Sequence, residues 1–335
     1  MNRRHHSRRE FMTALTLAGS TAWLGARPRP VDAEPPPETT TLKLFEFPIA
    51  CFAPYYLAEE LLRAEGFTDL QYVKLAPTQT NLKALSNGEI HFTITDIHSA
   101  LLHVDGEPSI LLLAGIHGGC YELFVTNGVR TVRDLKGRII SVANRGRQAF
   151  VSSIAAWIGL NPHRDIDFLL QPASSGMELF AQGVVDGFMG FPPDPQELRS
   201  KKIGAVLVDT KVDRPWSQYL CCFLAGNPAF VRRHPVATKR AMRAILKSID
   251  VCASDPDRAA RALIARGYTA RPDFALQAIK EIPYTLWRGY SPSDTVRFHA
   301  IRLHEVGIIK SSPQAIIAQG TDWRFLNELR KELKG

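Results

Sequence analysis

Residues 80–96 read TNLKALSNGEIHFTITD. A short helical pattern from Thr80 to Asn87 closes at Gly88, a residue type that commonly follows the end of a helix. His91 to Thr95 then alternates as a strand that ends at Asp96. A helix followed at once by a strand is the unit from which parallel sheets covered by helices are built, so this stretch predicts an α/β fold.

The alternation of strand and helix extends in both directions and occurs twice. The first series has strands at 41–47, 71–75, 91–95, 109–115 and 121–125 and helices at 53–66 and 80–87. The second series has strands at 135–142, 166–170 and 185–189, a loop at 143–147, and helices ending at Gly159 and Gln182. After Phe223 only helical patterns follow, at 235–254, 257–266, 273–282, 293–306 and 323–333. The sequence predicts two sheet-and-helix lobes and a helical C-terminal third.

The N-terminus has the three parts of an export signal. Arg8 and Arg9 precede an apolar run from Phe11 to Ala26 that is too short and too interrupted to span a bilayer. Val31-Asp32-Ala33 then has the small-x-small form of a cleavage site. The order SRREFM at 7–12 resembles the twin-arginine signal. We expect residues 1–33 to be a signal peptide, cleaved near Ala33 after passage through the twin-arginine machinery to the periplasm. The alternative is a basic arm in front of a soluble domain.

Charge and length bound what remains after that cleavage. The segment 1–33 carries six Arg and two acidic residues, so its removal lowers the net charge from +8 to +4. A charge of that size gives no case for nucleic-acid binding and only modestly favours anionic ligands. Residues 34–39 include the run EPPPE and are expected to form a linker. The remaining chain is long enough for two lobes.

Five cysteines are present: Cys51, Cys120, Cys221, Cys222 and Cys252. An odd number cannot pair completely, and no CxxC spacing occurs. We therefore expect neither a disulfide framework nor a metal site, but buried free thiols.

Three stretches carry a family resemblance. Residues 84–92, ALSNGEIHF, resemble a helix-turn-strand motif ALxxGEIDF, with His91 in the place of Asp. Residues 132–142, VRDLKGRIISV, are similar to DLKGKxVAV, and 183–187, GVVDG, followed by two prolines, are similar to GEVDA and its proline-bearing loop. With the export signal and the two lobes, these motifs resemble the periplasmic solute-binding proteins of ABC importers, in particular the nitrate, sulfonate, taurine and thiamine-pyrimidine-precursor group.

The resemblance implies a type II, two-lobed periplasmic-binding-protein fold. Lobe 1 would comprise residues 40–126 and 224–335, lobe 2 residues 127–223, and the crossovers at 126–127 and 223–224 would form a hinge. It also implies a monomer that binds a small molecule and delivers it to the permease subunits of a transporter. Ligands of parallel sheets lie beyond the carboxyl ends of the strands, where helix N-termini supply free N–H groups.

The strand-end loops of lobe 1 supply the first candidate ligand-binding residues. Phe47, Phe52 and Tyr55 follow the first strand, as an apolar wall of the cleft or as a hydrophobic staple. Thr95 and Asp96 end the third strand, where Asp96 would cap the next helix, contact a ligand, or do both. His117 ends the fourth strand, either as a ligand contact or as a structural residue.

Lobe 2 supplies the other candidates. Residues 143–148, ANRGRQ, form a strand-to-helix turn in which Asn144, Arg145, Arg147 and Gln148 would hold a carboxylate or sulfonate, the alternative being a solvated basic turn. The turn lacks the Walker lysine and the full GxGxxG spacing of a nucleotide loop. Phe191 and Pro192 close the matching strand of this lobe, and Trp216 would stack on a ligand.

Aromatic and apolar residues outnumber charged residues in these loops, which is more than a bare inorganic anion needs. We therefore expect a small organic anion with an aromatic or heterocyclic body, and no cofactor. One alternative is an inorganic-anion binder, for nitrate or bicarbonate. The other is an enzyme similar to the yeast-type thiamine-pyrimidine synthase, because residues 219–223, YLCCF, resemble the cysteine cluster of that enzyme. No GxSxG, HExxH or SxxK motif is present, so we do not expect a hydrolase.

Overall fold

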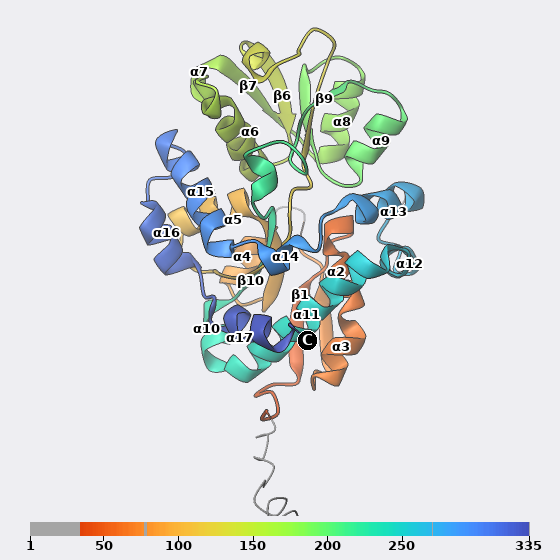
Figure 1. Cartoon of the computed structure of the whole chain (residues 1–335), viewed down its shortest axis with the longest axis vertical. Helices are drawn as coiled ribbons and strands as arrows, with labels where there is room; N and C mark the ends of the chain where they lie inside the picture. Colours follow the sequence, from red (N-terminus) through yellow and green to blue (C-terminus); the bar gives the residue numbers. More distant parts are fainter. Residues whose placement is uncertain (1–33, 77–78, 270, 335) are drawn as a thin grey trace, which may run out of the picture. The chain divides into compact units, whose positions relative to one another are not determined.

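The computed structural model describes residues 34–76, 79–269 and 271–334. Within these residues the strands form two five-stranded sheets (Figure 1). The first sheet has the order β2-β1-β3-β10-β4, with bounds β1 Thr41–Phe45, β2 Asp69–Val73, β3 Phe92–Asp96, β4 Leu111–His117 and β10 Cys222–Gly226. β1 runs parallel to β2 and β3, and β10 runs antiparallel to β3 and β4. The expected α/β class is confirmed.

The second sheet repeats this plan. Its order is β7-β6-β8-β5-β9, with bounds β5 Glu122–Val125, β6 Arg138–Val142, β7 Ile166–Leu170, β8 Gly187–Gly190 and β9 Ala205–Asp209. β6 is parallel to β7 and β8, while β5 is antiparallel to β8 and β9. In each sheet the fourth strand is the one that arrives after a crossover from the other sheet.

This arrangement differs from the expected division of the chain at two strands. Residues 122–125 were expected in the first lobe, but β5 completes the second sheet by pairing on both edges. Residues 222–223 were expected in the second lobe, but they begin β10 of the first sheet. The crossovers are therefore 118–121 and 210–221. The two crossovers lie side by side and are joined by hydrogen bonds at both ends. Tyr121 N donates to Thr210 Oγ1 at 2.9 Å, and Cys221 N donates to His117 O at 2.9 Å.

Helices follow most strands, as the pattern predicts. Those of the first half are α2 Ala53–Leu57, α3 Glu59–Ala64, α4 Asn81–Ser86 and α5 Ile97–Gly106. Those associated with the second sheet are α6 Arg145–Trp157, α7 Pro162–Asp165, α8 Ala173–Ala181 and α9 Asp194–Ser200. The described residues also form three short 3-10 helices: η1 Ala50–Phe52, η2 Val132–Leu135 and η3 Trp216–Gln218. α6 begins at Arg145, within the stretch expected to be a loop, because Asn144 caps it by accepting from Arg147 N at 2.9 Å.

The C-terminal third is helical, as expected, and several of its helices pack against the first sheet or the helices that cover it. They are α10 Pro228–Arg233, α11 Pro235–Ser254, α12 Pro256–Ala265, α13 Pro272–Glu281, α14 Leu286–Gly289, α15 Pro292–Glu305, α16 Pro313–Gly320 and α17 Arg324–Glu332. The apolar stripe of α11 is buried at Met242, Ile245, Leu246 and Ile249. It packs on α2 and α17, so this stripe is a core face.

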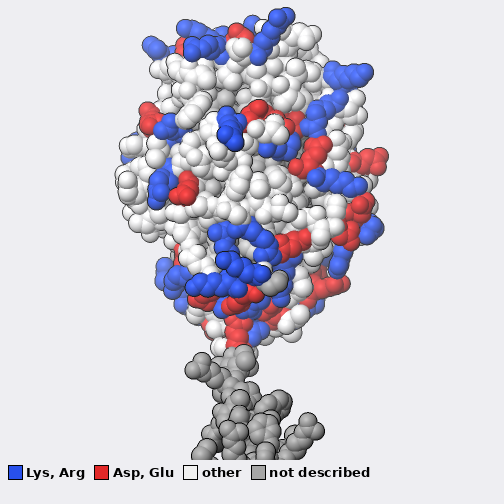
Figure 2. All heavy atoms as spheres, in the orientation of Figure 1, with Lys and Arg blue, Asp and Glu red and all other residues white. Residues whose placement is uncertain are grey.

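Basic and acidic side chains are mixed over most of the face shown in Figure 2. Basic residues gather near α17, around a surface hollow lined by Arg288, Arg330, Lys331 and Lys334. Among the described residues, none of the helices combines the length and the apolar character that a bilayer-crossing segment requires.

Candidate functional site

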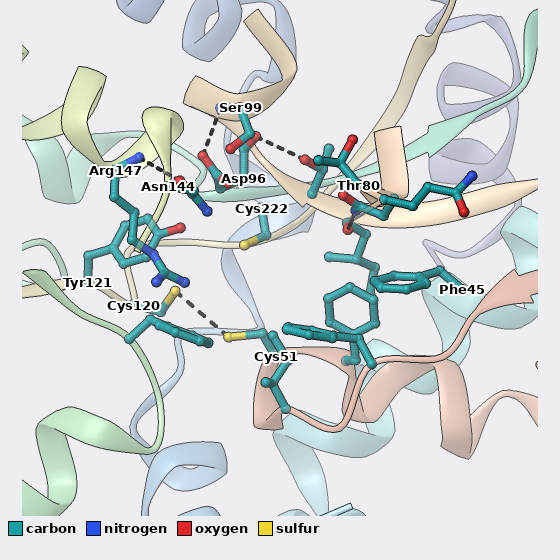
Figure 3. Close-up of a pocket in the computed structure, with 18 residues that line it drawn as sticks. Phe45, Cys51, Thr80, Asp96, Ser99, Cys120, Tyr121, Asn144, Arg147 and Cys222 are labelled. Carbon is teal, nitrogen blue, oxygen red and sulfur yellow. Dashed lines mark hydrogen bonds between the residues drawn. The ribbon is translucent and has the colours of Figure 1, made fainter. Parts of the chain in front are cut away.

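A cavity of about 250 Å³ lies where the carboxyl ends of β1 and β3 face the N-terminus of α6 and the end of β8 (Figure 3). We call this cavity the cleft. Both sheets contribute to it, as expected for a ligand site beyond the ends of parallel strands. Its lining residues are Phe45, Phe47, Ile49, Cys51, Phe52, Gln79, Thr80, Asn81, Ile94, Thr95, Asp96, Ser99, Cys120, Tyr121, Asn144, Arg147, Phe191 and Cys222.

An aromatic wall forms one side of the cleft. The ring centroids of Phe45 and Phe47 are 5.5 Å apart, and the ring planes are nearly parallel. The Phe52 ring meets both edge-on, at 6.0 and 5.8 Å. Phe47 keeps 39% of its surface exposed, so its ring is accessible to a ligand. Such a wall offers apolar contact and stacking to a flat ligand.

A polar wall comes from the ends of β3 and the starts of α4 and α5. Asp96 caps α5, as predicted, by accepting from Ser99 N at 2.9 Å. Asn81 Nδ2 donates to Ile94 O at 3.1 Å, and Thr80 Oγ1 accepts from Lys83 N at 3.2 Å. These bonds fix the side chains in place while leaving them at the cleft surface. They can therefore supply a few placed hydrogen-bonding groups to a ligand.

Arg147 brings a cation to the cleft. Its side chain is only 7% exposed, and its guanidinium lies 3.7 Å from the ring centroid of Phe191 and 5.7 Å from that of Tyr121. Its Nε has no hydrogen-bond partner, and no ion pair of Arg147 occurs among the described residues. A buried cation without a carboxylate partner is costly. The group is therefore ready to bind an anion, next to the N-terminus of α6.

The structure shows which of the two predicted anion-binding arginines faces the cleft. Arg145 is exposed and does not line the cleft, whereas Arg147 is buried and lines it. Of the other predicted site residues, Phe47, Phe52, Thr95, Asp96, Asn144 and Phe191 also line the cleft. Phe45, Tyr121 and the polar residues at 79–81 and 99 also line the cleft but were not predicted from the sequence. Their positions at strand ends and helix caps could have identified them.

The remaining predicted site residues do not line the cleft: Tyr55, His117, Gln148, Pro192 and Trp216. Tyr55 is fully buried in the core, and Trp216 packs edge-on against Phe150 with ring centroids 5.4 Å apart. His117 is also fully buried, and its Nδ1 lies 2.7 Å from Gly118 O. Each was predicted from its place near a strand end, but four of the five are buried outside the cleft lining, and Gln148 is half-buried on α6.

Four of the cysteines form one group, and three of them, Cys51, Cys120 and Cys222, line the cleft. All five thiols are buried and free, as expected. The Sγ atoms of Cys51 and Cys120 are 3.9 Å apart, those of Cys120 and Cys221 3.5 Å, and those of Cys221 and Cys222 3.9 Å. The hydrogen bond from Cys221 is the main cause that lowers the pKa of Cys120 below its ordinary value.

The two adjacent cysteines, Cys221 and Cys222, do not lie together within a regular strand. Cys221 precedes β10, and the pairing of β10 with β4 is irregular between Cys222 and Phe223. Because the regular alternation of a strand does not apply there, the two sulfurs need not point to opposite faces.

A second buried cluster connects helices of the two sheets. His98 of α5 stacks on Phe150 of α6 with ring centroids 4.3 Å apart, and meets His299 of α15 edge-on at 4.5 Å. Neither ring nitrogen of His98 has a hydrogen-bond partner. Burial lowers the pKa of His98 well below its ordinary value and lowers the pKa of His299 to about 3. Both rings are therefore neutral in the folded protein near neutral pH.

We expect the protein to lose stability as the pH falls from about 6.5 toward 4. In this window the unfolded state, with histidine pKa values near 6.5, binds protons that the folded state excludes. Each of the two histidines contributes a slope of about 1.4 kcal/mol per pH unit. Above pH 6.5 this contribution is constant. Denaturant titrations between pH 7.5 and 4.5 measure the slope. His98→Phe, which cannot titrate, is expected to flatten it, and parallel profiles of variant and wild type would contradict this.

Comparisons with known proteins place the chain in a family. Residues 50–259 match the family model described as NMT1/THI5 like. A search of curated proteins found no match. Among solved structures, the chain is similar to the periplasmic nitrate-binding protein NrtA from Synechocystis PCC 6803, at 15% identity, 90% coverage of each chain and a TM-score of 0.74.

Two further structures have the same fold. The alkanesulfonate-binding protein SsuA from Xanthomonas axonopodis pv. citri, bound to MOPS, is 16% identical, with 87% of this chain and 99% of that one covered and a TM-score of 0.69. The desulfurization enzyme DSZB is 15% identical, with 87% and 99% covered and a TM-score of 0.61. The architecture is thus the periplasmic-binding-protein fold. Since the family model spans more than half of the chain, this protein belongs to the NMT1/THI5 like family.

Proposed function

We propose that this protein is an extracytoplasmic solute-binding protein of an ABC importer. It captures a small organic anion in the cleft and delivers it to the permease. The observation that carries the proposal is Arg147, a buried cation without an ion pair among the described residues, facing the same cavity as the aromatic wall. The likeness to nitrate- and sulfonate-binding proteins supports the same role.

Sulfonates and aromatic carboxylates, or heterocycles that carry such a group, fit this combination. The anionic group would bind the guanidinium of Arg147, and the body of the ligand would lie against Phe45, Phe47 and Phe52. Asp96 would accept from an amine or ring N–H. An inorganic anion would leave the aromatic wall without a function.

Capture requires the two sheets to close on the ligand. We propose a first lobe of residues 40–117 and 222–335, a second lobe of residues 122–209, and a hinge formed by the two crossovers. Contacts outside the cleft support a closed arrangement. Arg271, which precedes α13, pairs with Asp194 of α9 at 3.0 Å, and Gln196 donates to Glu281 at 2.9 Å. Domain closure about such a hinge is a common response to ligand binding.

The alternative is an enzyme on the same fold, of the thiamine-pyrimidine-synthase type. The cysteine group near the cleft is the observation in its favour, and one structural neighbour is named an enzyme. The predicted export signal would suit a periplasmic protein rather than a cytosolic enzyme.

Incubation with candidate ligands distinguishes the two functions. A binding protein is expected to return the ligand chemically unchanged and to melt at a higher temperature in its presence. At a ligand concentration of one hundred times Kd, the stabilisation should be about 2.7 kcal/mol. Mass spectrometry of the ligand and a thermal melt measure both quantities. A ligand that is converted to a product with multiple turnovers would reject the binding role.

Export is the other part of the proposal. Residues 1–33 lie outside the described part of the chain, so the twin-arginine signal and the cleavage near Ala33 stay predictions. Replacing Arg8 and Arg9 with Lys is expected to reduce export and to leave folded protein in the cytoplasm, because this route depends on the arginine pair. Periplasmic and cytoplasmic fractions can be compared by immunoblot. Equal export of the variant would refute the twin-arginine assignment.

A further inference from the structure

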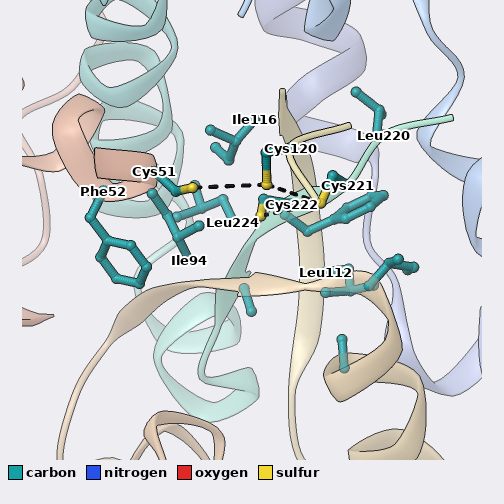
Figure 4. Packing of buried hydrophobic residues seen from close by; sticks show 14 of the residues in the cluster. Cys51, Phe52, Ile94, Leu112, Ile116, Cys120, Leu220, Cys221, Cys222 and Leu224 are labelled. Carbon is teal, nitrogen blue, oxygen red and sulfur yellow. Dashed lines mark hydrogen bonds between the residues drawn. The ribbon is translucent and has the colours of Figure 1, made fainter. Parts of the chain in front are cut away.

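A set of soft donor atoms that anion capture does not use lies at and directly behind the surface of the cleft. Cys51 comes from η1, His117 from the end of β4, and Cys120 from the first crossover. Their Sγ and imidazole nitrogen atoms lie within 4.8 Å of one another, and all three side chains are buried. Figure 4 shows the sulfurs of Cys51 and Cys120 directed toward each other amid apolar side chains.

His117 is oriented as a metal ligand would be. Its Nδ1 lies 2.7 Å from the carbonyl oxygen of Gly118, an acceptor, so Nδ1 carries the proton and donates. The lone pair therefore resides on Nε2, which is buried and has no hydrogen-bond partner. A backbone carbonyl that fixes the tautomer of an imidazole in this way is the usual support of a metal-binding histidine.

The sulfur spacing also fits a tetrahedral ion. With Zn–S bonds of about 2.3 Å, two thiolates at adjacent corners of a tetrahedron lie about 3.8 Å apart. The Sγ atoms of Cys51 and Cys120 are 3.9 Å apart. Two thiolates and one neutral imidazole balance a divalent cation, so the occupied site would bury no net charge.

We propose that Cys51, His117 and Cys120 form a binding site for a soft divalent cation of the Zn²⁺ type. The fourth position is open to the cleft, because Cys51 and Cys120 line it. Water or a donor atom of the captured solute completes the coordination. Because the sulfur ligands are thiolates in the bound state, binding is accompanied by proton release. The assignment replaces the sequence expectation that no metal site exists, and it does not depend on the identity of the organic ligand.

Cys221 and Cys222 form a competing triad with Cys120, also within 4.8 Å. That set contains three thiols and no imidazole, so three thiolates would leave one negative charge in excess of a divalent cation. The test must therefore distinguish the two triads, which share only Cys120.

The experiment is a calorimetric titration of the full, reduced and metal-free protein with Zn²⁺, without any organic ligand. We expect a stoichiometry of one ion per chain, with proton release detected as a dependence of the binding heat on the ionisation enthalpy of the buffer. Cys51→Ala and His117→Ala should each weaken binding by at least about tenfold, the effect of losing one ligand or its support. Cys221→Ala and Cys252→Ala should leave it unchanged, Cys252 being the buried cysteine outside the group.

Alkylation of the wild-type protein provides a second readout that needs no variant. Zn²⁺ is expected to protect Cys51 and Cys120 from iodoacetamide under partly denaturing conditions, as mapped by mass spectrometry, and to leave Cys252 unprotected. Binding that survives Cys51→Ala and His117→Ala but disappears in Cys221→Ala would overturn the assignment. So would the absence of stoichiometric binding in the wild-type protein.

Discussion

Arg147→Ala is expected to weaken the binding of an aromatic sulfonate or carboxylate by at least about 30-fold. Removing one partner of a buried, hydrogen-bonded charge pair costs about 2 to 5 kcal/mol, and about 1.4 kcal/mol corresponds to a factor of ten in Kd. The anionic group would be left in a cavity whose aromatic wall cannot solvate it. Calorimetric titration of the ligand into wild-type and variant protein measures the change.

Arg145→Ala is the matched control, because it removes the same charge from the same turn at an exposed position outside the cleft. Its affinity should stay within about twofold of the wild type, since surface charges act weakly. Arg147→Ala also removes the contact of the guanidinium with the Phe191 ring, so a thermal melt of the ligand-free variant must first show that it is folded at the titration temperature. Equal affinities for the Arg147 and Arg145 variants would move the anion site elsewhere in the cleft.

Gly146→Ala is expected to weaken ligand binding by about 5- to 150-fold through closure rather than through direct contact. A Cβ atom at Gly146 would lie 2.1 Å from Ser99 Oγ and 2.9 Å from Ser99 N. Rotating the serine side chain relieves only the first clash, so α6 and α5 must separate. Overpacking of this kind costs about 1 to 3 kcal/mol, which gives the stated range in Kd.

Small-angle scattering with and without ligand measures this effect directly. The wild type should become more compact on binding, and Gly146→Ala should compact less. Gly106→Ala makes the same substitution at a helical glycine whose Cβ would meet no neighbour within 4 Å, so it should behave as the wild type does. Full compaction and unchanged affinity in Gly146→Ala would contradict closure at the contact between α5 and α6.

The sequence was sufficient for the architecture because the evidence for it is local. Strand and helix alternate with visible stops, and Gly88 has a positive φ of 76° at the predicted helix end. The information that assigns β5 to a sheet is not local in the sequence. The strand follows β4 directly in the chain, and only its pairing with β8 and β9 places it in the second sheet.

The candidate site could be predicted only in part for similar reasons. Aromatic and polar residues at strand ends identified Phe47, Phe52, Asp96 and Arg147. Which arginine faces the cleft depends on where α6 begins, since residues two apart in a helix point in nearly opposite directions. The sulfur cluster brings together three segments that lie far apart in the sequence, and no spacing rule finds such a set.

A calorimetric screen of the wild-type protein tests the central claim most directly. The panel contains sulfonates, aromatic carboxylates, pyrimidines, nitrate and bicarbonate. If the cleft captures a small organic anion, at least one sulfonate or aromatic carboxylate should bind with a stoichiometry of one per chain, and more tightly than nitrate or bicarbonate. Binding of nitrate or bicarbonate alone, with no organic member of the panel bound, would contradict the account.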